Sequence, residues 1–454
     1  MELKGKKVLV VGAGKTGKAI TDFLVKNGAH VTLNDKGKKP VTFHPLDPSV
    51  ETVWGSHPED LFKVMDLIVL SPGVPLRLSP IQKALKQGIP VIGELELASE
   101  FIDLPIIAIT GTNGKTTTTT LTAEILKNSG IATFVGGNIG RPLIKLCTDP
   151  GPYQWAVLEV SSFQLATASH FHPKAAAILN IEPDHLDWHP SFEDYSRAKW
   201  SIAKNMGTDD ILVLFAPLLG HKPPGIKSIT YTFTDSGDEK HMAYIKDAAL
   251  CWQFGVTFLK VPIQELAVQQ THILLDMLAA GLLSGTAGAP KDIIADTLRT
   301  FQGLPHRMEI AGQINGVRFI NDSKATNVDA VFWALKGLSG NIIWLAGGLW
   351  KGGNLSALTS EVEGKVKAII AFGSSSNLFK NAFGNITKTI EAGTLGEAVT
   401  KAFRTAVPGD TVLLSPACAS FDQFKDYRER GKAFKGYVES FKTKFNESRY
   451  VSGK

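Results

Sequence analysis

Short β-rich apolar runs alternate with helical patterns along this chain, and the alternation starts three times. The first series is KKVLVVG, the helical pattern GKAITDFLVKNG and the strand pattern HVTLND. A second series contains PIIAIT, WAVLEV and KAAAILNI, and a third, near residue 305, contains RFINDSK, NIIWLAGG, KAIIAFGSS and DTVLLSPA. Strands that alternate with helices pair in parallel and are covered by the helices. The sequence therefore predicts an α/β fold.

The chain has 454 residues, which fits three domains at roughly 150 residues each. We predict domains at residues 1–96, 97–303 and 304–454. Hydrophobic residues make up 44% of the chain and charged residues 20%, as in globular proteins with sizeable cores. The net charge of +5 is small and no block of Lys and Arg stands out, so we expect no nucleic-acid partner.

Cysteine use and the N-terminus predict the cellular compartment. Cys147, Cys251 and Cys418 are scattered and form no CxxC pair, which favours a reducing compartment over a zinc or disulfide framework. The N-terminus enters a strand without the apolar region of a signal peptide, and no apolar run has the length of a membrane span. We therefore predict a cytoplasmic protein without membrane contact.

The first chemical motif is GAGKTG, in which Gly12, Gly14 and Gly17 leave a strand and open a helix. Asp35 ends the next strand, where a dinucleotide-binding fold places an acid that binds ribose. Glycines let the backbone approach a diphosphate at a helix N-terminus. The motif predicts diphosphate binding, the alternative being a tight turn without ligand, and it does not require the diphosphate to be NAD.

The second motif is GTNGKT, from Gly111 to Thr116, between a buried strand and a helix. Ile109 stands at the position of the first glycine of a full GxxxxGK[ST] loop. Lys115 is expected to reach the β- and γ-phosphates, and the Thr116 hydroxyl to bind Mg²⁺. Glu159, at the end of the strand in AVLEVSS, is the candidate carboxylate for the same ion, although many strands end in Glu. We expect Thr117–Thr120 to begin the helix.

A third stretch, NIEPDHLDWHPSFEDYSRAKWSI, joins a strand to a helix and carries Asp184, His185, Asp187, His189 and Lys199. A zinc site at the histidines lacks a Cys/His quartet and is disfavoured. Taken alone, Lys199 is expected to be a solvated helix lysine.

The last third contains GLPHRME, NDSKATN and LSPACASFDQF. Arg307 and Lys324 are cations that suit the neutralisation of a transferring phosphoryl group. Asp322 and Ser323 suit either such a site or a helix N-cap, and both interpretations stay open at this point.

These motifs together resemble the Mur ligase family. The resemblance is carried by GTNGKTT, LEVSSFQL, DHLDWH, YSRAKW, GLPHRME, NDSKATN and LSPACASFDQFKDYRERG, in this order and over the whole chain. GGNIG, SSFQL, GAGKTG and SPG (71–73) favour the member that adds D-glutamate over those that add L-alanine, a diamino acid or a dipeptide.

The resemblance implies a Rossmann-like N-terminal domain for the UDP-sugar, a central P-loop ATPase-type domain with a parallel or mixed sheet, and a Rossmann-like C-terminal domain. The reaction it implies is amide-bond formation between UDP-N-acetylmuramoyl-L-alanine and D-glutamate in peptidoglycan precursor synthesis. ATP would first phosphorylate the substrate carboxylate, and the D-glutamate amine would then attack the acyl phosphate. We expect a monomer that binds these small molecules.

The resemblance also implies roles for individual residues. The UDP-substrate site would contain Gly14, Thr16, Asp35, Ser71, Gly73, Asn138, Gln164 and His185. The ATP site would contain Gly111, Thr112, Asn113, Gly114, Lys115, Thr116, Thr117, Arg307, Asp322 and Lys324. The D-glutamate site would contain Thr326, Lys351, Ser420, Phe421 and Tyr427. Two Mg²⁺ ions would be held by Thr116, Glu159, His185 and Lys199, the last as a carbamate. The catalytic residues would be Lys115, His185, Lys199 and Lys324.

Three departures from the family pattern stand out. Where the family has GxHNxxN, this chain has QTHILLD (270–276), with Ile273 and Asp276 in place of two asparagines. The GGxxKG turn carries the bulky Leu349 and Trp350, and no arginine stands near Asp35.

Other functions remain to be distinguished. Another amino-acid-adding Mur ligase would share most of the motifs. A nicotinamide-dependent oxidoreductase would explain GAGKTG but leave GTNGKT without a purpose, and NADH binding would support it. A non-catalytic nucleotide-binding homologue would bind ATP without forming ADP.

Overall fold

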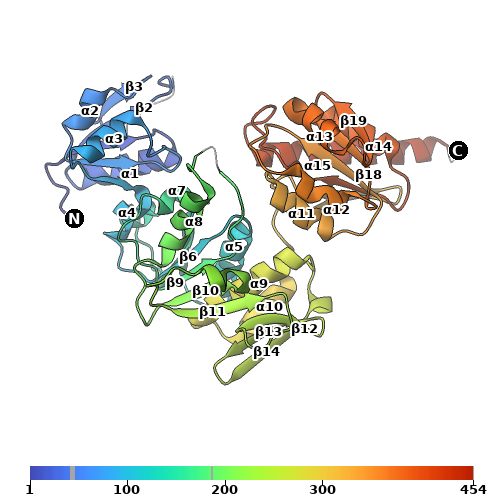
Figure 1. The fold of residues 1–454 in the computed structure, drawn as a ribbon, viewed down its shortest axis with the longest axis horizontal. Helices are drawn as coiled ribbons and strands as arrows, with labels where there is room; N and C mark the ends of the chain where they lie inside the picture. The colour runs from blue at the N-terminus through green and yellow to red at the C-terminus, as the bar shows by residue number, and fades with distance from the viewer. Residues whose placement is uncertain (41–46, 186–187, 453–454) are drawn as a thin grey trace. The chain divides into compact units, whose positions relative to one another are not determined.

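The computed structural model describes residues 1–40, 47–185 and 188–452. Contacts divide the chain into two compact units, which are described separately. The first is made from Met1–Ile181, Trp188–Leu266 and Ile273–Phe301, and the second from Glu182–Asp187, Ala267–His272 and Gln302–Lys454. Figure 1 shows their helices and strands along the chain. Asp187 lies outside the described residues.

The first unit begins with a five-stranded, fully parallel sheet in the order β3-β2-β1-β4-β5. This is half of a doubly wound fold, in which ligands bind beyond the carboxyl ends of the strands where the strand order reverses, here between β1 and β4. The elements are β1 (Lys7–Val11), α1 (Lys15–Lys26), β2 (His30–Asp35), β3 (Glu51–Trp54), α2 (Glu59–Lys63), β4 (Leu67–Leu70), α3 (Ser79–Lys86), β5 (Val91–Gly93) and α4 (Glu94–Ser99).

The same unit contains a nine-stranded sheet in the order β14-β13-β12-β11-β10-β9-β6-β8-β7. Its elements are β6 (Ile106–Thr110), α5 (Lys115–Asn128), β7 (Thr133–Gly137), α6 (Ile144–Thr148), β8 (Trp155–Glu159), α7 (Ser162–Leu165), β9 (Ala175–Ile178), α8 (Phe192–Trp200), η1 (Ser201–Ala203), β10 (Ile211–Phe215), η2 (Ala216–His221), β11 (Ile229–Thr234), β12 (Ala243–Lys246), β13 (Ala249–Phe254), β14 (Thr257–Pro262), η3 (Ile263–Glu265), α9 (Thr271–Thr286) and α10 (Lys291–Thr300).

The strands from β7 to β12 are parallel, whereas β12, β13 and β14 form an antiparallel extension. The sheet is therefore mixed. All five residues of β6 are buried, as expected for a strand that has a parallel neighbour on each side and helices on its faces.

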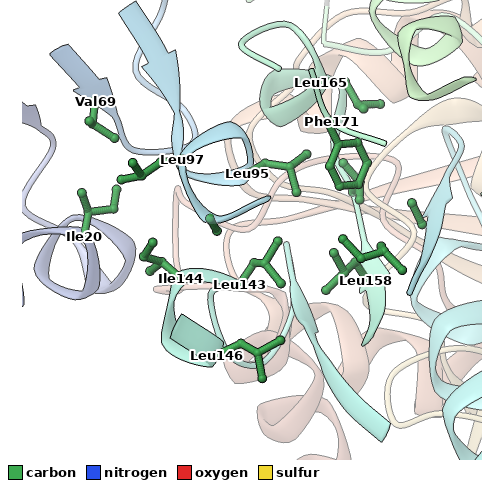
Figure 2. Close-up of a cluster of buried hydrophobic side chains, with 14 of the residues drawn as sticks. Ile20, Val69, Leu95, Leu97, Leu143, Ile144, Leu146, Leu158, Leu165 and Phe171 are labelled. Atoms are coloured by element: carbon green, nitrogen blue, oxygen red, sulfur yellow. The ribbon is translucent and has the colours of Figure 1, made fainter. Parts of the chain in front are cut away.

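One hydrophobic core joins the two sheets of the first unit. Figure 2 shows Leu95 and Leu97 of α4 beside Leu143 and Ile144, with Ile20 of α1 nearby. Because these side chains are buried in one cluster, the end of the N-terminal sheet and the start of the central sheet pack as one body.

The second unit contains a six-stranded sheet in the order β15-β16-β20-β17-β18-β19, parallel except for β15. Its elements are β15 (Glu309–Ile314), β16 (Val317–Asn321), α11 (Val328–Lys336), β17 (Ile342–Gly347), η4 (Leu355–Leu358), α12 (Thr359–Val362), β18 (Val366–Phe372), η5 (Gly373–Ser375), α13 (Ser376–Phe383), β19 (Lys388–Ala392), α14 (Leu395–Thr405), β20 (Thr411–Leu414) and α15 (Tyr427–Ser452).

The predicted fold class is confirmed: three α/β sheets follow one another, and the central one is mixed. The predicted strands near residues 7, 30, 106, 155 and 175 and those of the last third are present. The domain limits near residues 97 and 304 stay predictions, and residue 97 lies inside α4. Among the described residues, no helix has the length and apolar character needed to cross a bilayer.

Candidate active site

The central glycine loop is held in shape by Asn180, the second residue after β9. The backbone N–H of Thr112 donates to the Asn180 carbonyl (3.0 Å) and that of Asn113 to its side-chain oxygen (2.8 Å), and the Asn180 amide donates back to the Asn113 carbonyl (3.2 Å). Gly114 has a φ of +83°, and a Cβ there would lie 2.2 Å from a carboxylate oxygen of Asp276. The loop is thus fixed before any ligand binds.

Two lysine amines meet at one carbonyl of this loop. The Lys115 Nζ donates to the carbonyls of Gly111 and Thr112, each at 2.7 Å, and the Lys199 Nζ donates to Gly111 at 2.7 Å. Lys199 is 1% exposed, and its amine lies 4.6 Å from the centre of the Tyr195 ring. The expectation of a solvated Lys199 is therefore wrong, because α8 turns this side chain into the loop.

Two of the four predicted metal ligands, Thr116 and Glu159, lie together beside the loop, whereas His185 belongs to the second unit. The Thr116 hydroxyl donates to Glu159 Oε2 at 2.8 Å, and the Asn138 amide donates to Glu159 Oε1 at 2.7 Å. Glu159 is 2% exposed. A buried carboxylate and a hydroxyl are hard oxygen donors of the kind that Mg²⁺ prefers, so these residues fit the ion. Thr117, Thr118 and Thr119 are buried in α5, as expected for helix residues.

The backbone of the N-terminal glycine loop is held by side chains from the ends of β2 and β4. Asp35 Oδ2 accepts the N–H of Ala13 (2.8 Å), and the Ser71 hydroxyl donates to the Gly12 carbonyl (2.9 Å). A Cβ at Gly17 would lie 1.7 Å from the Gly12 oxygen, so only glycine fits there. Gly14 is exposed at the start of α1 and Thr16 is half-buried.

A pocket adjoins this loop between the end of β4 and α7. Three predicted UDP-substrate residues, Ser71, Gly73 and Gln164, line it. The other lining residues are Leu70, Pro72, Val74, Gly93, Glu94, Phe163 and Thr167. Gln164 is fixed by a capping box with Ser161 at the start of α7.

In the second unit, the predicted ATP residues Asp322 and Lys324 follow β16, and Arg307 precedes β15. The Asp322 carboxylate accepts the Ser415 hydroxyl (2.9 Å) and the Met308 N–H (3.2 Å), and burial raises its pKa to about 7. The Lys324 amine lies 4.2 Å from the centre of the Tyr427 ring. Arg307 is half-buried, and its charge acts against the burial that raises the pKa of Asp322. The second unit therefore holds two interacting pairs, Arg307 with Asp322 and Lys324 with Tyr427.

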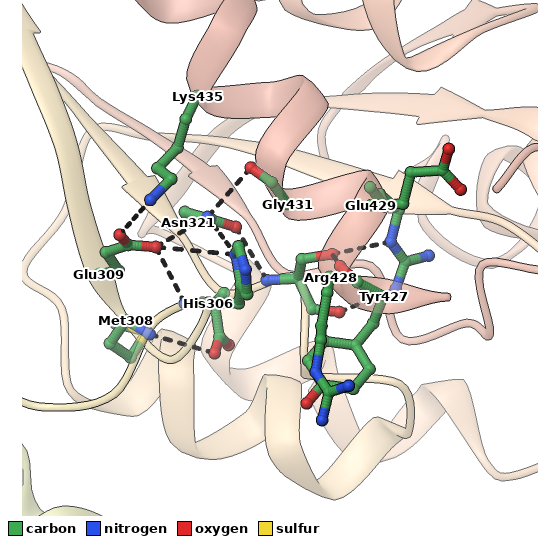
Figure 3. Close-up of polar contacts among 12 residues, drawn as sticks. His306, Met308, Glu309, Asn321, Tyr427, Arg428, Glu429, Gly431 and Lys435 are labelled. Atoms are coloured by element: carbon green, nitrogen blue, oxygen red, sulfur yellow. Dashed lines mark hydrogen bonds and ion pairs between the residues drawn. The ribbon is translucent and has the colours of Figure 1, made fainter. Parts of the chain in front are cut away.

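Figure 3 shows how the two motifs that carry these residues are held together. The Asn321 amide lies 2.9 Å from His306 Nδ1, and it donates to Glu309 Oε2 (3.0 Å) and to the Gly431 carbonyl (3.2 Å). The Lys435 amine donates to Glu309 Oε1 at 2.7 Å. The motifs GLPHRME and NDSKATN therefore share polar contacts with α15.

The N-cap interpretation of Asp322 and Ser323 is wrong. Helix α11 begins at Val328, and its N-cap is Asn327, whose side-chain oxygen accepts the Ala330 N–H at 2.9 Å. Asp322 and Ser323 are instead buried in the turn after β16. Backbone geometry decides this, because only the residue directly before the helix places its side chain over the free N–H groups.

A second polar cluster of this unit contains Asp184. Its carboxylate accepts the Asn327 amide at 3.1 Å and lies 3.6 Å from the Lys351 amine. Burial alone would raise the pKa of Asp184, but the charge of Lys351, with His185 and Asn327, lowers it. His185 has a φ of +54°. Of the other residues predicted to bind D-glutamate, Ser420 is buried, Thr326 is half-buried and Phe421 is 67% exposed.

Comparison with known protein families decides the family. The chain matches the Mur ligase MurD-like N-terminal domain over residues 6–93, the Mur ligase middle domain over 109–269 and the glutamate ligase domain of Mur ligases over 306–418.

This chain is a Mur ligase.

Full-length relatives support the assignment of this Mur ligase. It is 43% identical to a UDP-N-acetylmuramoylalanine--D-glutamate ligase of Pelotomaculum thermopropionicum, over 96% of this chain and 98% of that protein. It is 40% identical to a protein of the same name from Geotalea daltonii, over 96% and 98%. The fold resembles a pseudomurein peptide ligase of Methanothermus fervidus (TM-score 0.60, 21% identity, 96% and 100% covered) and a UDP-N-acetylmuramate-alanine ligase of Thermotoga maritima (0.59, 20%, 96% and 100%).

The residues at which this Mur ligase departs from the family pattern have the following places in the structure. Trp350 packs against the C-terminal core, with its ring centroid 6.3 Å from that of Phe379, and Leu349 is 44% exposed. Ile273 is buried in α9. Asp276 is also buried, and it accepts the Thr118 hydroxyl at 3.3 Å beneath the central loop.

The sequence did not single out Asn180 and Tyr195, which contact the central loop, and it did not predict the contacts of Asp184 with Asn327 and Lys351. Asn180 follows β9, which pairs with β6, so its place at a strand end next to the loop was a usable signal. Tyr195 lies one helical turn before Lys199. Its hydroxyl forms a hydrogen bond of 2.9 Å with the hydroxyl of Thr112. His189, the zinc candidate, is buried and lies 2.9 Å from the Ser162 hydroxyl.

Proposed function

We propose that this Mur ligase joins D-glutamate to UDP-N-acetylmuramoyl-L-alanine at the expense of ATP, in peptidoglycan precursor synthesis. The observation that carries the proposal is the meeting of Lys115 and Lys199 at the Gly111 carbonyl, next to the pair of Thr116 and Glu159. Relatives 40% and 43% identical over almost the whole chain bear the name of that ligase.

The central loop is proposed to bind the ATP phosphates. The N-terminus of α5 directs backbone N–H groups and a positive dipole end toward an anion. Lys115, now bonded to loop carbonyls, has an amine within reach of a phosphate at the same loop. Thr116 and Glu159 would hold Mg²⁺, which when bound neutralises phosphate charge. In the second unit, Arg307, Asp322 and Lys324 are proposed as further ATP contacts.

The other substrates are proposed to bind at the remaining predicted residues. Gly14, Thr16, Asp35, Ser71, Gly73, Asn138, Gln164 and His185 would hold the UDP-linked substrate. Thr326, Lys351, Ser420, Phe421 and Tyr427 would hold D-glutamate. A carboxylate is a poor acyl donor, so phosphoryl transfer to it comes first and attack by the amine follows; the chain's contribution is orientation and charge neutralisation. The chain would act as a cytoplasmic monomer.

Lys199 is proposed to react with CO₂ and form a carbamate, which would bind a second Mg²⁺ together with His185. Its amine is buried and shares one carbonyl with the amine of Lys115. Two cations in one site repel each other, which favours release of a proton from one amine. The neutral Lys199 amine would then add to CO₂ and lose a second proton to give the carbamate anion. Lys199→Ala should abolish turnover. A carbamate signal from ¹³C-labelled bicarbonate should appear in the wild type and vanish in the variant; full activity of the variant would refute the role.

The decisive experiment measures the amino-acid dependence of ADP release. With ATP, Mg²⁺ and UDP-N-acetylmuramoyl-L-alanine present, ADP should form only after D-glutamate is added. Equal turnover with L-glutamate, or without an amino acid, would contradict the proposal. Turnover with a different amino acid and its UDP-linked acceptor would identify another Mur ligase, and ATP binding without ADP would identify a non-catalytic homologue.

A further inference from the structure

Glu94 is a buried carboxylic acid in the wall of the substrate pocket. It is the first residue of α4, directly after β5, and is 1% exposed. Its Oε1 accepts the Ile144 N–H at 2.7 Å, whereas its Oε2 is buried and has no hydrogen-bond partner. Buried polar atoms are almost always paired, so an orphaned carboxyl oxygen at a pocket wall points to a ligand.

The position of Glu94 in the sheet indicates which part of a ligand it faces. Asp35 ends β2 and Glu94 follows β5, and the order β2-β1-β4-β5 places three strand spacings between them, about 14 Å at the same edge of the sheet. The glycine loop after β1 and Ser71 after β4 lie between the two acids. In a dinucleotide-binding fold the acid at the position of Asp35 binds the ribose of the nucleoside. A UDP-linked substrate with its nucleoside at Asp35 and its diphosphate at the loop therefore has its sugar and alanyl group toward Glu94.

The pocket residues around Glu94 are close-packed and uncharged, and the nearby Lys145 of α6 is paired with Asp22 at 3.2 Å. The Gly93 N–H donates to the Thr167 carbonyl at 3.1 Å, and a Cβ on Gly93 would lie 2.1 Å from the Thr167 hydroxyl, so β5 and α7 are in close contact. The pocket residues from β4 and α7 are not titratable. Cys147, also on α6, stays neutral because burial raises the pKa of its thiol to about 12.

We propose that Glu94 is a substrate-binding residue whose Oε2 donates a hydrogen bond to an acceptor oxygen on the sugar–alanyl part of the UDP-linked substrate, and not on the nucleotide. This inference rests on the proposed function. Burial raises the pKa of Glu94 to about 7, against the N–H groups of Ile144 and Leu143, which lower it. Because Oε1 accepts the Ile144 N–H, the proton of the neutral acid is on Oε2, the buried oxygen that has no hydrogen-bond partner.

The test compares dissociation constants for UDP-N-acetylmuramoyl-L-alanine and for UDP alone, measured by calorimetry on the full chain. Glu94→Leu should weaken binding of the muramoyl substrate about tenfold or more and change UDP binding less than twofold. Glu94→Gln keeps an acceptor for Ile144 and offers an N–H donor, so both constants should stay within threefold. Equal losses for both ligands, or no loss in Glu94→Leu, would overturn the inference.

Glu96 provides a matched control on the same helix. It is buried like Glu94, but its oxygens accept the N–H groups of Ser169, His170 and Phe171. Glu96→Gln should leave both dissociation constants unchanged within twofold. A loss in Glu96→Gln equal to that in Glu94→Leu would contradict a specific role for Glu94.

Proton uptake provides a second readout that does not depend on the folding of Glu94→Leu. If the neutral acid binds the substrate, binding raises the pKa of Glu94, so at pH 8 the wild type should take up a proton fraction that Glu94→Gln lacks. Equal uptake in both proteins would overturn the inference. A wild type that binds UDP but not the muramoyl substrate would contradict the proposed function and this inference with it, whereas tight wild-type binding with an unaffected Glu94→Leu contradicts the inference alone.

Discussion

The two glycine loops of the first unit share one pattern but offer a phosphate different surroundings. Each follows a central parallel strand and places a lysine directly after a glycine at the start of a helix: Lys15 after Gly14, and Lys115 after Gly114. Lys15 is exposed and donates to the Gly140 carbonyl, away from its own loop. Lys115 is half-buried and donates to two carbonyls of its own loop.

The charges of the groups around the two loops also differ. The N-terminal loop is held by neutral or acidic partners, the Ser71 hydroxyl and the Asp35 carboxylate. The central loop has a second buried amine from Lys199 and the pair of Thr116 and Glu159. The first arrangement suits a diphosphate that is bound and left unchanged, and the second suits a phosphoryl group that moves. Under the proposed function, the glycine spacing would place a phosphate at each loop, and the charges around it would decide the chemistry.

The largest expected effect is a difference in kcat between alanine variants of Lys115 and Lys15. Lys115→Ala should lower kcat by about 10³-fold, because a cation that stabilises the transferring phosphoryl group is lost. Lys15→Ala, the matched variant in the other loop, should change kcat less than about threefold, since its side chain is exposed. Steady-state ADP release measures both. Equal losses would show that the two loops do not differ in chemistry.

The next effect concerns the close contact inside the N-terminal loop. Gly17→Ala should lower the free energy of unfolding by about 3 kcal/mol, because its Cβ would lie 1.7 Å from the Gly12 oxygen. Gly14→Ala meets no atom within 4 Å and should cost less than about 1 kcal/mol. Urea unfolding of both variants tests this, and similar stabilities would contradict the predicted clash.

A smaller effect is expected at the corresponding contact of the central loop. Gly114→Ala should cost about 2 kcal/mol, since an alanine at a φ of +83° is strained and its Cβ would crowd the Asp276 carboxylate. The cost is smaller than at Gly17 because the crowded atom belongs to a side chain that can turn. The same unfolding assay, with ADP release as a second readout, decides the order of the two variants.

The smallest effect tests the acid of the N-terminal loop. Asp35→Asn keeps the size of the side chain but replaces one of the two acceptors for the N–H groups of Ala13 and Gly37. We expect the binding free energy of the UDP-linked substrate to weaken by about 1 kcal/mol, which raises its KM about fivefold. The kcat and the KM for ATP should stay unchanged. A change in kcat instead would assign Asp35 to the chemistry.

Much of the fold was readable from local patterns. The apolar runs at residues 106–110 and 155–159 are strands, and the loops that follow them lie side by side because β6 and β8 are parallel neighbours. The proximity of Thr116 and Glu159 could therefore be predicted from the sequence. The antiparallel strands β12, β13 and β14 were not predicted, because they continue a sheet through pairing that no local signal specifies.

Lys199 shows where local reading fails. Its helix has polar residues on several sides, and the sequence alone gave a solvated lysine. Burial to 1% exposure results from the packing of α8 against the loop after β6, a contact between residues 88 positions apart. The same limit applied to Asp322, for which a phosphoryl site and a helix cap both stayed open until the start of α11 at Val328 was known.

The sequence by itself determined the three α/β series, both glycine loops and the family, because strand patterns, glycine turns and motif order are local properties of the chain. Only the tertiary structure decided which amines share the Gly111 carbonyl and that Glu94 keeps one oxygen unpaired in a pocket wall. Burial and hydrogen-bond satisfaction are properties of the packed chain, since they depend on atoms that the sequence places far apart.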